Sequence, residues 1–440
     1  MIRPIKNKER EAIIQSLRSG VVPKIGLQHI QVGRSEEIKS FVRDIQNVSE
    51  GGSSFRFVIG EYGSGKTFFL SLVRSIALEK GLVTMHADLS PSKRLHGSQG
   101  QARYLLSELI SSLATRTRQD GNALENILDR FVSIVKEEVN LNRKGISQVV
   151  SSMLKDMAEI PGGFNFIQVV SVYCKAYEAE DEILKNKALK WLRAEYTTRI
   201  DSFADLGVRE YINDKSLLNT IKLYCLLVRK SGYNGLMVCL DELVNLYKIT
   251  NSVSRKANYE EILRMLNDTL QGSFSSLGFI MGGTPEFLTE PRRGLYSYEA
   301  LRSRLAENSF ATQLGLVDFN STVLRLASLT KEELYVLLQN LRHVFAYGDT
   351  DKYMVPDSAL NAFLIHCSNK IGDSYFRTPR TTIKAFLDLL SILEQYPSIK
   401  WTDVMGNIEI VADTEQSEFG KSDISQLGNN ADDEFASFRL

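Results

Sequence analysis

The sequence predicts an α/β fold built on a parallel sheet, with a large helical insertion and a C-terminal helical lid. First, an apolar run, a glycine-rich turn and an amphipathic stretch follow one another at 55–79, as a strand, a loop and a helix would. Second, GLMVCLDE at 235–242 is continuously apolar before its two acids, which is typical of a strand buried on both faces of a parallel sheet. Third, the pattern is helical almost throughout from about 100 to 230 and again from 331 to about 396.

The other elements follow from local patterns in chain order. NKEREAIIQSLR at 7–18 predicts a short helix, and a second helix is expected at 35–47 after an irregular segment. LVTMHAD at 82–88 and LGFIMGGTPEF at 277–287 predict two further buried strands. STVLRLASLT at 321–330 predicts the last strand of the sheet.

The end of that run also begins a helix. Thr330 and Glu333 form a T-x-x-E capping box before KEELYVLLQNLRHVF. The final stretch is polar, acidic and poor in apolar periodicity, so we expect it to be disordered from about 411, with FASFRL as a docking peptide. The expected parts are an N-terminal helical segment at 1–50, a core at 51–318 with its insertion at about 100–230, a helical lid at 319–400 and a polar tail at 401–440.

GEYGSGKT at 60–67 has the G-x-x-x-x-G-K-[ST] pattern of a phosphate-binding loop, in the strand–loop–helix context that this pattern requires. Its glycines permit turns in which successive N–H groups point at phosphate oxygens. Lys66 is placed to reach the β- and γ-phosphates of ATP, and the Thr67 hydroxyl to ligate Mg²⁺. The residues expected to bind the nucleotide here are Gly60, Glu61, Tyr62, Gly63, Ser64, Gly65, Lys66, Thr67 and Phe68.

The two acids of GLMVCLDE come at the carboxyl end of the expected strand, where ligands of parallel sheets bind. We expect Asp241 to hold Mg²⁺ through water and Glu242 to polarise the water that attacks the γ-phosphate. Taken alone, the pattern also fits a strand that ends in two solvated acids. The phosphate loop upstream favours the catalytic interpretation.

The two motifs are far apart in the chain: from Lys66 to Asp241 is 241 − 66 = 175 residues. One strand uses part of that length, so the rest must be a helical insertion of roughly a hundred residues, the size of a small domain. It fits a module that contacts a partner or DNA, and equally a structural buttress. Lys93, Arg94 and His96, which follow the second strand, fit either a phosphate-contacting pore loop or an ordinary surface loop.

Polar residues stand at the C-terminal end of the strand expected at 277–287 and in the stretch that follows it. Thr284 could orient the attacking water or sense the γ-phosphate, and it could equally cap the next helix, because Thr-Pro-Glu is a plausible helix start. The stretch RRGLYSYEALRSRLAEN is rich in arginine, and a neighbouring subunit could insert one guanidinium at the γ-phosphate as an arginine finger. Any single arginine here could also be a solvated helix charge. The arginines are Arg292, Arg293, Arg302 and Arg304.

Arg380 begins the last long helix of the lid, in TPRTTIKAFLDLLSILEQ. From there it could fold back onto the nucleotide and report hydrolysis by moving. The alternative is a contact with a nearby carboxylate.

Composition excludes several classes of protein. The chain has 440 residues, 53 Lys plus Arg and 53 Asp plus Glu, so net charge gives no argument for nucleic acid. Its four cysteines are scattered without a C-x-x-C pair, which fits a reducing cytoplasm and argues against a zinc site. The N-terminus lacks a signal-peptide pattern, and no apolar stretch reaches the ~18 residues that cross a bilayer. We therefore expect a cytoplasmic protein with no membrane partner.

The order of these motifs resembles an AAA+ ATPase of the origin-recognition type. More specifically, the strings GVVPKIGLQHIQVGR, GEYGSGKTFFL, DLSPSKRLHG, GYNGLMVCLDELVNLYKI and GGTPEFLTEPRRGLYSYEALRSRLAEN resemble the ATP-binding proteins of BREX-type and related bacterial phage-defence systems. The similarity covers most of residues 7–395.

The resemblance implies a ring or filament of identical subunits with the nucleotide between neighbours. It makes Arg304, by its S-R-L context, the first choice for the finger, and it places Val32, Gly33 and Arg34 against the adenine. Two features depart from the class. Thr284 stands where Asn is frequent, which puts water positioning in doubt. A winged-helix domain, usual after the lid in initiator relatives, is hard to see in the roughly 45 mostly polar residues that follow 395.

Two functions follow from this comparison. The first is an ATPase that drives or switches a DNA-directed defence complex with helicase- or nuclease-like partners, and double-stranded DNA as a possible ligand. The second is a nucleotide-gated assembly scaffold with slow turnover and no DNA contact. A small-molecule kinase is disfavoured, because the insertion and the arginine-rich stretch suit assembly better than a substrate lid.

Overall fold

The structure is a computed structural model that describes residues 5–143, 145–273 and 275–405. A sheet of five strands in the order β2-β3-β4-β1-β5 lies at its centre, and every pair of neighbouring strands is parallel. The predicted α/β fold with a parallel sheet is confirmed. The strands are β1 (Ser53–Gly60), β2 (Val83–Asp88), β3 (Leu236–Asp241), β4 (Leu277–Gly283) and β5 (Val323–Leu326).

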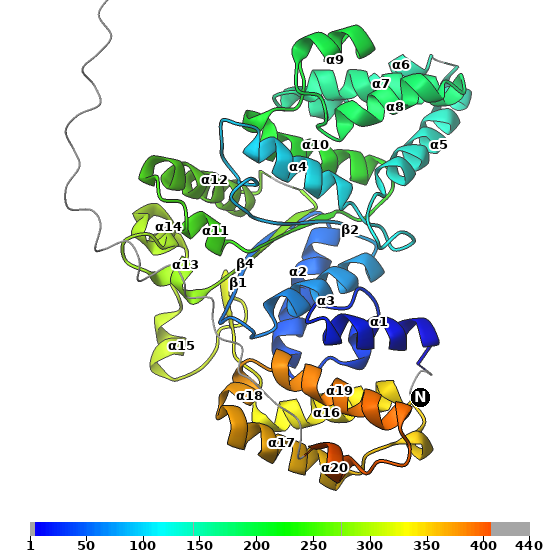
Figure 1. Ribbon diagram of the computed structural model, residues 1–440. Coiled ribbons are helices and arrows are strands. Elements are labelled where there is room, and N and C mark those ends of the chain that lie inside the picture. Colours follow the sequence, from blue (N-terminus) through cyan, green and yellow to red (C-terminus); the bar gives the residue numbers. More distant parts are fainter. Residues whose placement is uncertain (1–4, 144, 274, 406–440) are drawn as a thin grey trace, which may run out of the picture.

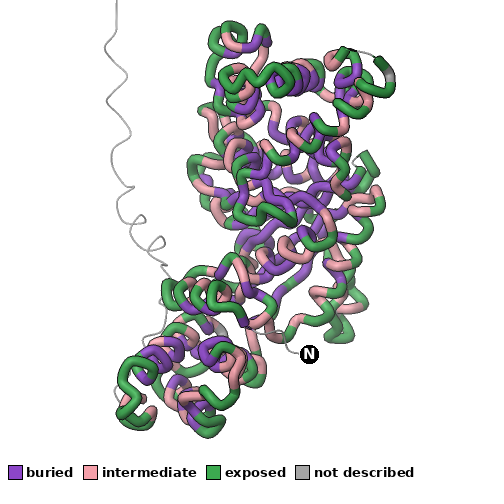
Figure 2. The backbone as a smooth tube through the Cα atoms, turned by 90° about the vertical axis from the view of Figure 1, so that its right-hand side faces the viewer, coloured by how far each residue is buried: buried purple, intermediate pink, exposed green. Residues whose placement is uncertain are grey.

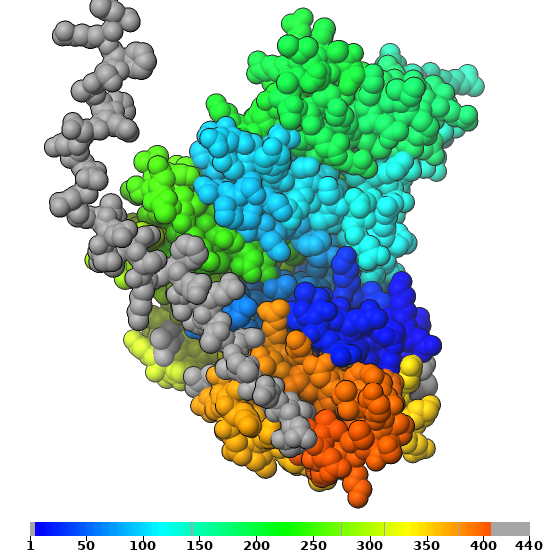
Figure 3. Space-filling model, viewed as in Figure 1, coloured from blue at the N-terminus to red at the C-terminus, as the bar shows by residue number. Residues whose placement is uncertain are grey.

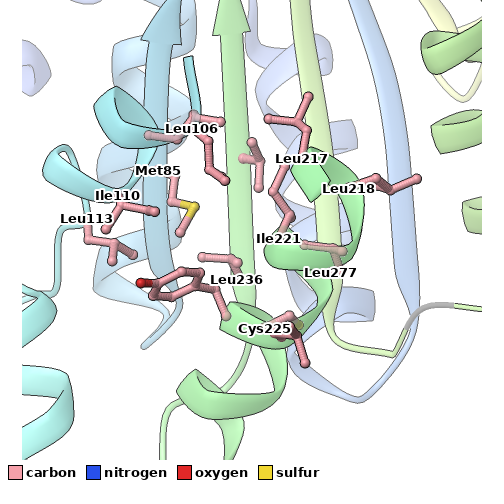
Figure 4. Close-up of a cluster of buried hydrophobic side chains, with 14 of the residues drawn as sticks. Met85, Leu106, Ile110, Leu113, Leu217, Leu218, Ile221, Cys225, Leu236 and Leu277 are labelled. Atoms are coloured by element: carbon pink, nitrogen blue, oxygen red, sulfur yellow. The ribbon is translucent and has the colours of Figure 1, made fainter. Parts of the chain in front are cut away.

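Helices cover both faces of the sheet, which explains the apolar strands (Figure 1). On one face, α2 (Ser35–Ser49) and α3 (Lys66–Glu79) pack on the strands in a cluster that includes Phe41, Val58 and Phe69. On the other face, α4 (Gln101–Ser111) and α10 (Leu217–Lys230) cover β2, β3 and β4. The side chains that meet there, shown in Figure 4, include Met85, Leu106, Ile110, Leu113, Leu217, Leu218, Ile221, Cys225, Leu236 and Leu277.

Among the described residues between β2 and β3 there are seven α-helices, most of which make a lobe at the top of Figure 1. Its buried residues belong to the same hydrophobic cluster as the sheet, and Figure 2 shows buried backbone running from the sheet into the lobe. Phe166 and Tyr224, for example, stack edge to face at 5.4 Å. The helices are α4 (Gln101–Ser111), α5 (Leu124–Asn142), α6 (Ile146–Met153), α7 (Gly163–Glu178), α8 (Glu182–Leu192), α9 (Arg199–Leu206) and α10 (Leu217–Lys230).

The C-terminal helices have a hydrophobic cluster of their own, and α1 (Asn7–Arg18) belongs to it through Ile13 and Ile14. Ion pairs tie α1 to α19, with Arg18 Nε 2.8 Å from Asp388 Oδ1. Figure 3 shows α1 packed against these helices. The two expected N-terminal helices therefore lie on different bodies, α1 on the C-terminal helices and α2 on the sheet. The C-terminal helices are α16 (Lys331–Phe345), α17 (Asp357–Ile371), α18 (Ser374–Arg377), α19 (Arg380–Gln395) and α20 (Trp401–Met405).

Within the described residues, five further α-helices follow β3 and β4 along the chain: α11 (Val244–Tyr247), α12 (Ser252–Leu270), α13 (Pro285–Thr289), α14 (Glu299–Arg304) and α15 (Ser309–Gln313).

The predicted capping box is present at the start of α16: Glu333 N donates to Thr330 Oγ1 at 3.1 Å, and Thr330 N to Glu333 Oε2 at 2.9 Å. The tail expected to be disordered from about 411 lies outside the described residues. Within the part of the chain that the structure describes, no helix combines the length and apolarity needed to cross a bilayer.

Candidate nucleotide site

The loop between β1 and α3 lies at the carboxyl edge of the sheet, and its backbone requires glycine. Gly63 and Gly65 have φ of +75° and +80°, a left-handed conformation that favours residues without a Cβ. A Cβ on Gly63 would also lie 3.1 Å from the Thr378 side chain, just before α19. The loop therefore lies against the C-terminal helices as well as at the end of the sheet.

Lys66 turns its ammonium into this loop. Its Nζ donates to the carbonyl of Gly60 at 2.7 Å and to that of Glu61 at 2.9 Å. Burial lowers the pKa of Lys66, and the nearby carboxylates of Asp241, Glu242 and Glu61 oppose that effect. The lysine thus puts a partly desolvated positive charge where the sequence pattern places the phosphates.

Thr67 and Asp241 meet beside the loop. Thr67 Oγ1 donates to Asp241 Oδ2 at 2.9 Å, and Asp241 Oδ1 accepts the N–H of Glu242 at 2.8 Å. Gly282 on the adjacent strand β4 makes room for this carboxylate, because a Cβ there would lie 2.3 Å from Asp241 Oδ1. This pair of oxygens suits Mg²⁺, which usually keeps several of its waters: the hydroxyl can bind the ion directly and the carboxylate through a water molecule, with positions left for phosphate.

Glu242 follows Asp241 in a left-handed conformation, with φ of +58°. A non-glycine residue rarely adopts this conformation, and Glu242 lines the cavity beside the loop. The carboxylate is exposed, and partial desolvation together with the charges of Asp241 and Asp88 raises its pKa. A raised pKa suits a group that accepts a proton from water.

Asp88 is a residue of this edge that the sequence analysis missed. It ends β2, and in the parallel register it stands opposite Asp241. Desolvation and the charge of Asp241 raise the pKa of Asp88. The sequence did show an acid, Asp88, at the carboxyl end of the strand predicted at 82–88. It could be assigned to the site only once β2 was known to lie next to β3.

A cavity of about 360 Å³ extends from the loop toward the C-terminal helices. Most of its walls come from the irregular segment at 20–34, the loop with the start of α3, and the C-terminal helices, and Glu242 lines it as well. The lining away from the loop is mostly apolar, including Val22, Ile30, Val32, Leu337 and Ile383, and Phe68 lines the cavity from the start of α3. An apolar pocket that ends in a cationic, N–H-rich loop fits a nucleotide, with the base at one end and the phosphates at the other.

The residues expected beside the adenine differ in position. Val32 and Arg34 line the cavity. Gly33, with φ of +60°, lies instead against the start of α16: a Cβ on it would be 2.0 Å from Glu333 Oε1.

Arg380 lines the same cavity at the start of α19. Its Nη1 donates to the Tyr62 hydroxyl at 3.4 Å, a contact between the C-terminal helices and the phosphate loop. Gly20 permits this position, because a Cβ there would lie 2.3 Å from Arg380 Nε.

Thr284 and Arg304 are occupied by contacts of their own. Thr284 is the N-cap of α13, and its Oγ1 accepts the Phe287 N–H at 3.4 Å, as the capping alternative predicted. Arg304 donates to Asn267 Oδ1 at 2.7 Å and to the Ala300 carbonyl at 2.8 Å, and it does not line the cavity. A single chain therefore does not bring Arg304 to its own nucleotide site.

Two observations test whether ATP and Mg²⁺ fit these residues. The Ser64 hydroxyl lies buried in the phosphate loop, and no hydrogen bond to its Oγ is found among the described residues. The described residues contain no group of three or more His, Cys, Asp or Glu side chains able to hold a metal. Mg²⁺ at Thr67 and Asp241 would thus need nucleotide oxygens and water to complete its coordination, as is usual for this ion. The residues of this site therefore fit both ATP and Mg²⁺.

A parallel sheet whose first strand leads through a glycine-rich loop into a helix is the architecture of P-loop nucleotide-binding proteins. The model of one protein family, described as BREX system ATP-binding protein BrxC/D, matches residues 5–409. The chain belongs to this family, which confirms the resemblance seen in the sequence. A comparison with curated proteins gave no match.

Proposed function

We propose that this chain is an AAA+ ATPase that hydrolyses ATP with Mg²⁺ to drive or switch a DNA-directed phage-defence complex. Membership of the BREX ATP-binding family indicates nucleotide binding and a role in phage defence. The observation that carries hydrolysis is the Thr67–Asp241 hydrogen bond, with Lys66 and Glu242 at the same edge of the sheet. A site that only bound ATP would not need an acid placed for proton transfer.

Each side chain has a distinct part in this proposal. The loop N–H groups and Lys66 bind the phosphates and orient the γ-phosphate. Thr67 and Asp241 hold the metal position, directly and through water respectively. When bound, Mg²⁺ neutralises charge on the β- and γ-phosphate oxygens. Glu242 orients a water molecule and accepts its proton.

Arg304 is proposed to act on the site of a neighbouring copy. Its own chain holds it on α12 and α14, outside the cavity, so only a second subunit can place its guanidinium at a γ-phosphate. This requires a homo-oligomer, in a ring or filament. Because Thr284 caps α13, its proposed contribution to positioning water requires the hydroxyl to leave the Phe287 N–H.

One observation favours the alternative, a nucleotide-gated scaffold with slow turnover. The cavity walls come from the sheet body and from the C-terminal helices, so a bound nucleotide contacts both. Binding alone would then fix their relative position, without hydrolysis. Helicase- or nuclease-like partners fit the first function, and the lobe of α5–α9 offers a surface for them or for double-stranded DNA.

The test measures particle mass by light scattering and phosphate release in parallel, for the parental protein and the Glu242→Gln variant, with ATP and with or without double-stranded DNA. An ATP-dependent rise in mass with DNA-stimulated turnover supports the DNA-directed ATPase. Nucleotide-dependent oligomers that ignore DNA and release little phosphate support the scaffold. A parental protein that neither binds nor hydrolyses ATP overturns both.

A further inference from the structure

The side chain of Arg34 connects three parts of the chain beside the phosphate loop. Its Nη2 donates to the carbonyl of Ser64 in the loop and, at 3.3 Å, to that of Ala327, between β5 and α16. The guanidinium also lies over the Phe69 ring of α3, 6.0 Å from its centroid. Arg34 therefore fastens the loop to α2, at whose start it stands, and to the connection toward the C-terminal helices.

The hydrogen bond to Ser64 fixes the direction of one peptide group. In a planar trans peptide, the carbonyl of one residue and the N–H of the next point in opposite directions. A Ser64 carbonyl turned toward Arg34 thus turns the N–H of Gly65 away from Arg34. Phosphate loops hold their ligand through N–H groups of this kind. The contact with Arg34 accordingly determines where one phosphate-binding donor points.

The surroundings of Arg34 suit a fixed, charged group. Burial lowers the pKa of the guanidinium, and the carboxylates of Glu37 and Glu333 act in the opposite sense. An arginine stays protonated in proteins even so, and hydrogen bonds from a charged donor are stronger than those between neutral groups. Glu333 belongs to the capping box of α16, so the start of the C-terminal helices also faces this arginine.

We propose that Arg34 is a positioning residue for the phosphate end of the nucleotide, acting through the Ser64–Gly65 peptide and not through contact with the base. This inference rests on the nucleotide site proposed above. Loss of Arg34 should therefore weaken the binding of ATP, whose phosphates contact the loop, and leave the binding of adenosine, which has no phosphates, unchanged.

The experiment measures binding of labelled ATP and labelled adenosine to the full chain by equilibrium dialysis, for the parental protein and Arg34→Met. Methionine keeps an unbranched side chain about as long as the aliphatic part of arginine, and any residue with a Cβ meets the same backbone requirement at φ 57°. We expect affinity for ATP to fall about ten- to hundredfold, the range for losing hydrogen bonds from a charged donor, and affinity for adenosine to stay the same. We expect Arg34→Lys to bind ATP more tightly than Arg34→Met and less tightly than the parental protein. The lysine ammonium replaces the charge but not the planar set of N–H donors of the guanidinium.

Two controls separate the possible causes. Like the half-buried Arg34, the buried Arg56 donates to main-chain carbonyls, those of Phe319 and Ser321, but it does not line the cavity. Arg56→Met therefore shows how binding responds to the loss of a buried arginine elsewhere, and we expect no preference between the two ligands.

Lys66→Ala tests the site itself, and we expect it to lose ATP affinity selectively. If Arg34→Met weakened ATP and adenosine equally, or neither, while Lys66→Ala lost ATP, the role of Arg34 would be overturned and the nucleotide site would stand. Unchanged ATP affinity in Lys66→Ala would overturn the proposed site and, with it, this inference.

Discussion

At the scale of single residues, Lys66 and Glu242 share one edge of the sheet, and we propose that they contribute to different steps. Lys66→Ala removes the ammonium that the loop carbonyls hold, so we expect ATP binding to be lost. Glu242→Gln keeps the shape and removes the base, so binding should persist while turnover falls by about 10²–10⁴-fold. Nucleotide titration and phosphate release measure the two effects. Glu286→Gln, at an exposed acid near the loop, is the matched control, and parental turnover in Glu242→Gln would exclude Glu242 as the base.

Gly282 gives a second prediction at this scale. Gly282→Ala would put a Cβ 2.3 Å from Asp241 Oδ1 and 2.9 Å from Leu70, so the carboxylate must move away from Thr67. We expect the fold to lose about 1–3 kcal/mol, typical of overpacking, and the Mg²⁺ concentration needed for ATP binding to rise. Gly145→Ala is the control, because nothing lies within 4 Å of its Cβ position. Thermal unfolding measures the loss of stability, and a titration with Mg²⁺ measures the concentration needed for ATP binding. An unchanged Mg²⁺ requirement would count against a role of Asp241 in holding the metal.

The residues of this edge differ in how far the sequence could reveal them. Lys66, Thr67, Asp241 and Glu242 stand in two short motifs, so their residue types and spacing were enough to predict them as site residues. Asp88 and Gly282 were missed, because their relation to Asp241 depends on β2 and β4 lying on either side of β3. Strand order is a property of the whole sheet that no local pattern records.

At the scale of elements, α1 belongs to the C-terminal helices and not to the sheet. The sequence predicted its bounds, 7–18, because apolar residues recur at helical spacing, but that spacing shows only that one face is buried. What covers the face is a tertiary matter: Ile13 and Ile14 pack among α16 and α19, more than three hundred residues away in the chain.

Ile13→Ala tests this packing. Ile13 is fully buried, so we expect its truncation to cost about 2–5 kcal/mol and to lower the urea midpoint of the C-terminal body. Because Leu17 and Gly20 next to α1's end line the cavity, ATP affinity should fall as well. Ile365→Ala on α17 is the control, since that side chain is 62% exposed. Equal stability of the two variants would show that α1 is not docked as the structure has it.

At the scale of the whole molecule, the chain carries a nucleotide site and an arginine that cannot reach it. We expect Arg304→Ala to bind ATP normally as an isolated subunit and to hydrolyse it poorly in the assembly. We expect Lys66→Ala to be inactive for the opposite reason, because it keeps Arg304 and lacks the lysine proposed to bind the phosphates. Mixed in equal amounts, the two variants would form some interfaces with an intact loop on one side and an intact arginine on the other.

Random mixing in a head-to-tail ring would make about a quarter of the interfaces complete, so phosphate release should recover to a measurable fraction of the parental rate. Neither variant can produce that recovery alone, and a purely structural defect in either would not be corrected by the other. Arg302→Ala mixed with Lys66→Ala is the matched control, because Arg302 lies on the same short helix two positions away. A mixture of Arg304→Ala and Lys66→Ala that stays inactive, while the subunits still co-assemble with ATP, would show that Arg304 does not act across an interface.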